Sequence, residues 1–228
     1  MSANNVERTF AFVDLSGFTA LNEAHGDEHA VAMLARFRKL TEQALGTDDM
    51  LVKTIGDAVM LAFVTPSAAL SALRRLFDLA EEDSDMPLLR GGAHTGSAIA
   101  EDNDYLGAAV NLAARVAAYA GGGQLLVTES VAFAATDLDE VISFVGATSL
   151  RNIAEPVDLY EIELNPRSAT AVDPVCAMKV STTKPSTVHL KHDNRDLWFC
   201  GLSCVSRYST APELFHNADI GAAEVPRR

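Results

Sequence analysis

Two aspartates, Asp14 and Asp57, stand where acidic side chains can do chemistry. Asp14 ends a strand-like apolar run and Asp57 lies in a turn between two others, so one sheet could bring the carboxylates together. Two converging carboxylates suit Mg2+, which prefers oxygen ligands and keeps waters and phosphate oxygens as its remaining ligands. The small residues Ser16 and Gly17 would let backbone N–H groups approach phosphates closely. The alternative is that Asp14 caps a turn and Asp57 is an ordinary hairpin residue.

Strands and helices alternate along the part of the chain that must position these residues. Apolar runs predict strands at residues 8–14, 51–55, 58–63, 88–94, 98–100, 124–128, 141–147 and 157–164. Helical spacing predicts helices that begin at Asp27, after Pro66 and near Gly107. In the first of these helices the predicted apolar stripe is Ala30, Val31, Leu34, Phe37, Leu40 and Ala44. This order predicts an α+β fold in which one mostly antiparallel sheet is covered by helices.

The composition excludes several classes of protein. A formal charge of −13 opposes binding to a phosphate backbone, so we expect no nucleic-acid partner. No run reaches the roughly 18 to 20 apolar residues of a membrane span, and residues 1–5 lack the segments of a signal peptide. We therefore expect a soluble, cytoplasmic protein without a membrane span.

The chain divides into unequal parts. Its 228 residues suffice for one full-sized domain and a small second module. The polar, proline-containing residues 165–172 are typical of a linker. We therefore predict a first domain at residues 1–164, a module at 173–216 and a loose tail at 217–228.

Three strings resemble signature motifs of the class III adenylate and guanylate cyclases. They are Phe12-Val-Asp-Leu-Ser-Gly-Phe-Thr19, Lys53-Thr-Ile-Gly-Asp-Ala-Val-Met60 and Asp104-Tyr-Leu-Gly-Ala-Ala-Val-Asn-Leu-Ala-Ala-Arg115, and they occur in the family's order. The resemblance extends from about Arg8 to Leu164 and includes a closing string at residues 150–160. It implies the cyclase fold, a ferredoxin-like or palm-type antiparallel sheet covered by helices.

The resemblance assigns roles to the residues around the two aspartates. Asp14, Asp57 and the carbonyl of Leu15 would bind two Mg2+ or Mn2+ ions, which activate the ribose 3'-hydroxyl and hold the triphosphate. Residues 16–19, that is Ser16, Gly17, Phe18 and Thr19, would contact the substrate. Arg90 and Arg151 are weaker candidates for triphosphate contacts.

Lys53 and Asp104 occupy the family's base-reading positions. A lysine donor and a carboxylate acceptor complement N1 and the amino group of adenine, whereas guanine presents the reverse pattern. The resemblance therefore favours ATP over GTP. Without the family, Lys53 would be a solvated strand residue and Asp104 a loop residue.

Asn111 and Arg115 match the family's transition-state pair and, four residues apart on one helix, share a face. Arg115 would stabilise charge on the phosphorus and Asn111 would orient the ribose. In this family the aspartates come from one protomer and the other four residues from its partner, which implies a homodimer. The sequence thus predicts an adenylate cyclase, a guanylate cyclase being less favoured. The alternative is an inactive nucleotide-binding or metal-sensing protein that keeps the fold for dimerisation.

Cys176, Cys200 and Cys204 are the chain's three cysteines, and their surroundings resemble the YHS domain, related to TRASH-type metal-binding modules. Three thiolates would suit Zn2+ or Cu+, and a metal would help so small a module to fold. Asp173, His189 and His192 are the candidates for a fourth ligand, whereas His25, His29 and His94 are interpreted as structural. The alternative is that the cysteines are reduced core residues.

Overall fold

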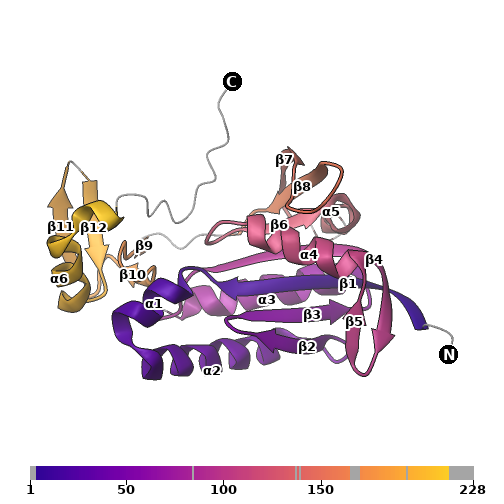
Figure 1. The fold of residues 1–228 in the computed structure, drawn as a ribbon, viewed down its shortest axis with the longest axis horizontal. Coiled ribbons are helices and arrows are strands. Elements are labelled where there is room, and N and C mark those ends of the chain that lie inside the picture. Colours follow the sequence, from indigo (N-terminus) through magenta and orange to yellow (C-terminus); the bar gives the residue numbers. More distant parts are fainter. Residues whose placement is uncertain are drawn as a thin grey trace.

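A computed structural model describes residues 4–83, 85–136, 138, 140–164, 170–193 and 195–215. Within these residues, one main sheet has the order β2-β3-β1-β4-β6-β8-β7, and β5 pairs with the end of β4 (Figure 1). The strands are β1 (Asn4–Leu15), β2 (Met50–Ile55), β3 (Ala58–Phe63), β4 (Leu89–Glu101), β5 (Asp104–Leu106), β6 (Leu125–Thr128), β7 (Ile142–Thr148) and β8 (Val157–Ile162). The β4–β6 pair is parallel and the other pairs are antiparallel, which confirms the predicted α+β sheet.

The two short strands predicted at residues 88–94 and 98–100 are one strand, β4. It pairs with β1 along its whole length, from Asn4 opposite Ala100 to Leu15 opposite Leu89. This pairing carries the strand through a central polar stretch that the sequence alone marks as a break. The short strand β5 was not predicted.

Helices cover both faces of the main sheet (Figure 1). They are α1 (Phe18–His25), α2 (Asp27–Ala44), α3 (Pro66–Glu82), α4 (Ala108–Tyr119) and α5 (Glu129–Thr136). The three predicted helices correspond to α2, α3 and α4, whereas α1 and α5 were not predicted. At the start of α3, the hydroxyl of Thr65 accepts from the backbone N–H of Ala68 and Pro66 occupies the first turn, an arrangement that favours a helix start.

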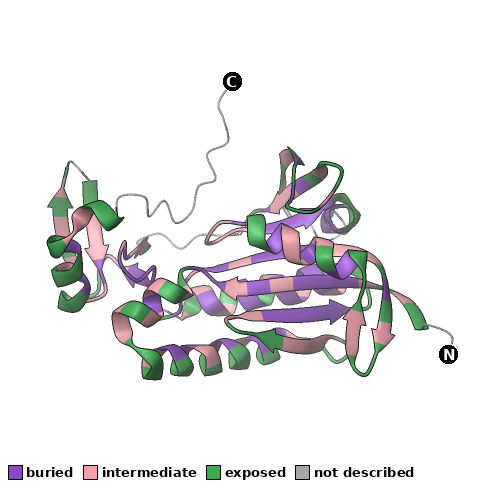
Figure 2. Cartoon of the chain, in the orientation of Figure 1, coloured by how far each residue is buried: buried purple, intermediate pink, exposed green. Residues whose placement is uncertain are grey.

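The alternation of side chains along β1 divides the core. Ala11, Val13 and Leu15 join a cluster with α2, α3 and α5, whereas Phe10 packs under α4 on the opposite face. Figure 2 shows that β3 is buried along most of its length, whereas β1 is exposed near the N-terminus and mostly buried from Thr9 onward. By the same alternation, Asp14 lies on the face that α4 covers in part.

One residue of the predicted stripe on α2 was misplaced. Val31 is 64% exposed, while Met33 is buried with Ala30, Phe37 and Ala44. The stripe that includes Val31 and the stripe that includes Met33 both have helical spacing, so periodicity alone did not show which one is buried.

The helix α4 approaches the sheet closely at Gly92. A Cβ on this residue would lie 2.1 Å from the backbone nitrogen of Ala117, so only glycine fits. This contact fixes how α4, and with it Asn111 and Arg115, lies over the sheet.

Residues 170–215 form a small unit, here called the C-terminal module. Its elements are β9 (Thr170–Val172), β10 (Lys179–Ser181), β11 (Val188–His192), β12 (Arg195–Phe199), α6 (Leu202–Thr210) and a 3-10 helix, Pro212–Phe215. Residues 170–172 of the predicted linker are a strand, because β9 pairs with β10. The rest of that linker, residues 165–169, and the predicted tail lie outside the described residues.

The C-terminal module packs against the end of the main fold near α1, α2 and α3 (Figure 1). Val175, Met178, Phe199 and Tyr208 belong to the same apolar cluster as the core beneath α2 and α3. Met178 also forms a β-bridge with Pro87. Among the described residues, no helix is long and apolar enough to cross a membrane.

Candidate active site

The strand register brings the two predicted aspartates together. Asp14 lies opposite Ala58 on β3 and opposite Arg90 on β4. Asp57 is the residue directly before Ala58, in the β2–β3 turn. Because Asp14 is paired with the neighbour of Asp57, the two carboxylates share one end of the sheet.

Arg90 is the counterion of this acidic pair. Its Nε donates to Oδ1 of Asp14 at 2.6 Å and its Nη2 donates to Oδ2 at 3.0 Å. This hydrogen bonding raises the pKa of Arg90. Burial raises the pKa of Asp57, and the charge of Asp14 raises it further, against the opposing effects of the backbone N–H of Asp57 and of Arg90. The carboxylates therefore concentrate negative charge at a place that attracts a cation.

The turn after Asp14 leads directly into α1. Gly17, with φ 74°, is the N-cap of α1 and gives no side-chain cap, so the first N–H groups of the helix are left without an intrahelical acceptor. The N–H of Ser16, by contrast, donates to the carbonyl of Leu88 at 2.8 Å. The N–H of Ser16 is therefore occupied within the protein. Contact of residues 16–19 with a substrate stays a prediction.

Lys53 on β2 and Asp104 on β5 form an ion pair. The second oxygen of Asp104 accepts from the backbone N–H of Tyr105 at 2.8 Å. The bond from Lys53, and then that from Tyr105, lowers the pKa of Asp104. The two residues are part-exposed, so they present a fixed donor and a fixed acceptor side by side.

Asn111 and Arg115 lie on the part of α4 that faces away from the sheet. The buried residues of α4 are Ala109, Val110, Ala113, Val116 and Ala117. Within the described residues, no hydrogen bond or ion pair joins Asn111 or Arg115 to the aspartates or to the Lys53–Asp104 pair. Arg151 is exposed in the turn between β7 and β8. The candidate residues thus form three groups on one chain, with Arg151 apart from them.

Comparison with known proteins places this arrangement in a family. The model of the adenylate and guanylate cyclase catalytic domain matches residues 2–160. The chain belongs to the adenylate and guanylate cyclase family.

A pH-sensitive adenylate cyclase of Mycobacterium tuberculosis is 35% identical over 158 residues, which cover 68% of this chain and 40% of the relative. A putative adenylate cyclase of Rhizobium meliloti is 27% identical over 210 residues, covering 85% of this chain and 35% of the relative. This chain therefore spans less than half the length of these relatives.

Solved cyclase structures share the fold of the cyclase domain. An adenylate cyclase of Trypanosoma brucei, analysed in its monomeric state, superposes with a TM-score of 0.65 at 24% identity, covering 72% of this chain and 91% of that structure. The adenylyl cyclase CyaB of P. aeruginosa gives a TM-score of 0.62 at 20% identity and covers 73% and 98%. At these identities the comparison establishes the fold alone.

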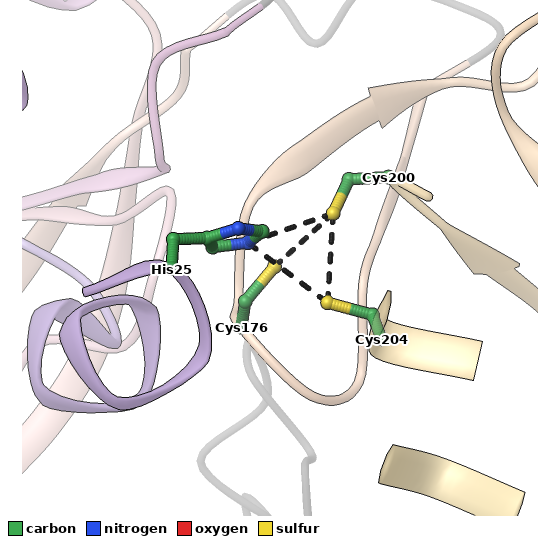
Figure 3. Close-up of side chains that lie close together, drawn as sticks. All are labelled: His25, Cys176, Cys200 and Cys204. Carbon is green, nitrogen blue, oxygen red and sulfur yellow. Dashed lines mark hydrogen bonds between the residues drawn. The ribbon is translucent and has the colours of Figure 1, made fainter. Parts of the chain in front are cut away.

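A second group of chemically active side chains lies between the cyclase domain and the C-terminal module. Cys176, Cys200 and Cys204 converge, and the fourth member of the group is His25, from α1 (Figure 3). Hydrogen bonds from Cys176 and Cys200 lower the pKa of the Cys204 thiol, whereas the bond to Cys200 raises that of Cys176. The hydrogen bonds within the cluster therefore stabilise a thiolate among the three sulfurs.

None of the three predicted candidates for a fourth ligand belongs to this cluster, although Asp173 lies beside it. Asp173 accepts backbone N–H groups, His189 bonds to Asp196 at 2.8 Å, and His192 bonds to the hydroxyl of Tyr208 at 2.8 Å. The interpretation of His25 as structural did not anticipate its place beside the cysteines. Its distance along the chain left no spacing signal to find it.

Proposed function

We propose that the chain is an adenylate cyclase, which converts ATP to 3',5'-cyclic AMP and pyrophosphate at a site shared by two protomers. The observation that carries this proposal is the convergence of Asp14 and Asp57 at one end of the sheet. Membership of the cyclase family and the adenylate cyclase names of relatives support the choice of reaction.

The donor set fits the hard divalent ions that the family implies. Two carboxylates supply hard oxygens. The bidentate contact of Arg90 with Asp14 indicates that these carboxylates stabilise a positive charge beside them. Asp14, Asp57 and the carbonyl of Leu15 would hold Mg2+ or Mn2+. When bound, the two ions would supply Lewis-acid activation of the ribose 3'-hydroxyl and neutralise charge on the triphosphate.

The start of α1 and two arginines would bind the phosphates. The free N–H groups after Gly17, at residues such as Phe18 and Thr19, point along the helix axis toward an anion and gain from the helix dipole. Arg90 lies beside the aspartates, so it can move from Asp14 to a phosphate oxygen as the negative charge of Asp14 is neutralised. Arg151, which is exposed, is the weaker candidate.

Lys53 and Asp104 would select the base. Their ion pair already holds a donor next to an acceptor, which matches N1 and the amino group of adenine. Guanine would place a donor against Lys53 and an acceptor against Asp104, so each polar group would be left without a partner.

Asn111 and Arg115 would act on the site of the partner protomer. Their face of α4 is directed away from the sheet of the same chain. Exposed apolar residues lie on this helix and directly before it, namely Tyr119 (42% exposed) and Leu106 (51% exposed). Such apolar exposure favours burial against a partner. Arg115 would stabilise the transition-state charge, and Asn111 would orient the ribose.

A mixing experiment tests the shared site. Asp57→Ala and Arg115→Ala should each abolish activity, and the mixture should recover about a quarter of it, since half of the dimers regain one intact site of two. A mixture of Asp14→Ala with Asp57→Ala is the matched control and should stay inactive, because every site then lacks an aspartate. If the first mixture is also inactive although heterodimers form, the shared site is wrong.

A product assay with ATP or GTP and Mn2+ tests the reaction and the base. The wild type should form cyclic AMP, and absence of any cyclic product would favour the inactive alternative. The charge-reversed pair Lys53→Glu with Asp104→Lys should lower the ATP-to-GTP ratio of kcat/KM by about a hundredfold or more, because two hydrogen bonds to charged groups are exchanged. An unchanged ratio would refute the role in base selection.

The convergence of the three cysteines supports the prediction of a YHS-like, metal-binding C-terminal module. A metal there would hold together loops that have little apolar core of their own.

A further inference from the structure

The cluster of His25 with the three cysteines joins segments from opposite ends of the chain. His25 ends α1 of the cyclase domain, Cys176 precedes β10, Cys200 follows β12 and Cys204 lies in α6 (Figure 3). Their four potential ligand atoms all lie within 4.8 Å of one another. No other element of the described chain offers a comparable group of soft ligands.

The separations within the cluster match those around one tetrahedral ion. Zn–S bonds of about 2.3 Å and Zn–N bonds of about 2.0–2.1 Å place two sulfurs about 3.8 Å apart and sulfur and nitrogen about 3.6 Å apart. The Sγ atoms of Cys176 and Cys200 are 3.7 Å apart, and those of Cys200 and Cys204 are 3.5 Å apart. Nε2 of His25 lies 3.7 Å from the sulfur of Cys200 and 3.9 Å from that of Cys204. These sulfurs are too far apart for a disulfide.

A buried carboxylate holds the cysteine-bearing loops in place. Asp173 is fully buried, and its Oδ1 accepts from the N–H of Val175 at 2.8 Å and of Cys176 at 3.4 Å. Its Oδ2 accepts from the N–H of Cys200 at 2.8 Å. Asp173 therefore fixes Cys176 relative to Cys200 without being a ligand itself, and so acts as a positioning residue.

An ion can reach the cluster from solvent. A cavity of about 390 Å³ lies between α2 and the C-terminal module, and its walls include His25, His29, Met178 and Cys200. Cys176 and Cys204 are buried behind this opening. The site thus has both a closed inner side and an entry path, as a metal site requires.

We infer that His25 and the three cysteines form one Cys3His site for a soft divalent cation such as Zn2+, and that the ion fastens the C-terminal module to α1. Each thiol that becomes a ligand releases its proton to solvent. The inference does not rest on cyclase activity, because the ligands are separate from Asp14 and Asp57.

The C-terminal module contacts α1 at a second place besides the cluster. The residue next to Cys176, Ala177, packs against Gly17 at the start of α1, where a Cβ on Gly17 would lie 2.1 Å from the Cβ of Ala177. His25 lies at the other end of the same helix. The C-terminal module therefore contacts both ends of α1, and the ion would fasten the end at His25, close to the cysteine that precedes Ala177.

Cobalt binding to the reduced, metal-free chain of 228 residues tests the site. Co2+ bound by thiolates gives charge-transfer absorption that oxygen-bound Co2+ does not, so the signal separates this cluster from the aspartates. His25→Gln should weaken binding by at least about a hundredfold, since loss of a group that merely orients a ligand already costs about 10- to 100-fold. His29→Gln is the matched control, because His29 lines the same cavity with its ring 5.1 Å from that of His25, and it should bind as the wild type does.

Two results would overturn the inference. One is a His25→Gln chain that binds Co2+ with the affinity and spectrum of the wild type. The other comes from the unmodified chain, which needs no variant to fold: Zn2+ should protect His25 from acylation by diethyl pyrocarbonate, read by mass spectrometry, and should slow hydrogen exchange throughout α1. If Zn2+ changes neither quantity, the ion does not bind His25.

Discussion

A buried lysine of the C-terminal module provides the sharpest test of how that module is attached. Lys179 is 3% exposed, and its ammonium donates to the carbonyl of Ala80 at 2.9 Å, to the carbonyl of Glu81 at 3.1 Å and to the carboxylate of Glu81 at 2.8 Å. These acceptors lie in the last turn of α3, which contains no basic residue of its own. The module therefore supplies the positive charge that this helix end favours.

Lys179→Met keeps the length of the side chain but removes all three hydrogen bonds. The carbonyls lose their partner, and the carboxylate of Glu81, whose side chain is only 21% exposed, loses its counterion. Breaking a buried ion pair by removing one partner costs about 3–5 kcal/mol. We expect the free energy of unfolding of the docked module to fall by about 3–5 kcal/mol.

Urea unfolding followed by tryptophan fluorescence measures this change, because Trp198, in β12 of the module, is the single tryptophan of the chain. Lys184→Met is the matched control. Lys184 belongs to the same module, is 50% exposed and lies 3.5 Å from Asp85, so its loss should cost less than about 1 kcal/mol. Equal shifts of the two variants would refute the reasoning from burial.

Two further predictions concern contacts elsewhere in the chain. Gly17→Ala should shift the Trp198 transition more than Gly56→Ala does, because both residues have positive φ but only at Gly17 would a Cβ clash, with Ala177. A larger shift for Gly56→Ala would contradict the close contact. Burial lowers the pKa of His94 below its ordinary value of about 6.5, so the unfolded chain binds the proton more readily. The free energy of unfolding should therefore be retained above about pH 6.5 and fall as the pH drops below it. Urea titrations at about pH 7.5 and about pH 5.5 measure this fall, which should be smaller in His94→Gln than in the wild type. An equal fall in both proteins would exclude His94 as its source.

Periodicity predicted the elements whose burial follows one clear stripe. The strands around Asp14 and Asp57 and the helices α2, α3 and α4 were predicted because each buries a continuous apolar face. The helix α1 was not predicted, since it has eight residues, begins at a glycine without a polar cap and buries only Leu21. The misassignment of Val31 has a similar cause, because two overlapping stripes on α2 have helical spacing and only the packing partner selects between them.

The candidate site was predictable as far as its residues act through local motifs. Asp14, Asp57, Lys53 and Asp104 lie in short strings. The register of β1 and β3 brings the two aspartates together, whereas the ion pair of Lys53 with Asp104 joins β2 and β5, which do not pair in the sheet. The hydrogen bond that occupies the N–H of Ser16 could not be anticipated, because Leu88 lies far along the sequence, directly before β4. The contact of His25 with the cysteines likewise depends on how the C-terminal module docks on α1, which sequence spacing does not predict.

The helix α1 links the two proposed metal sites. Its eight residues span about 12 Å, with the turn after Asp14 at one end and His25 at the other. The two sites differ in chemistry, since carboxylates favour Mg2+ or Mn2+ whereas thiolates favour Zn2+ or Cu+. Ions can therefore occupy both sites without exchanging between them. A change in the supply of soft metal would alter the attachment of α1 while leaving the ligands of the catalytic ions untouched, which is the arrangement needed for one metal to regulate a reaction that depends on another.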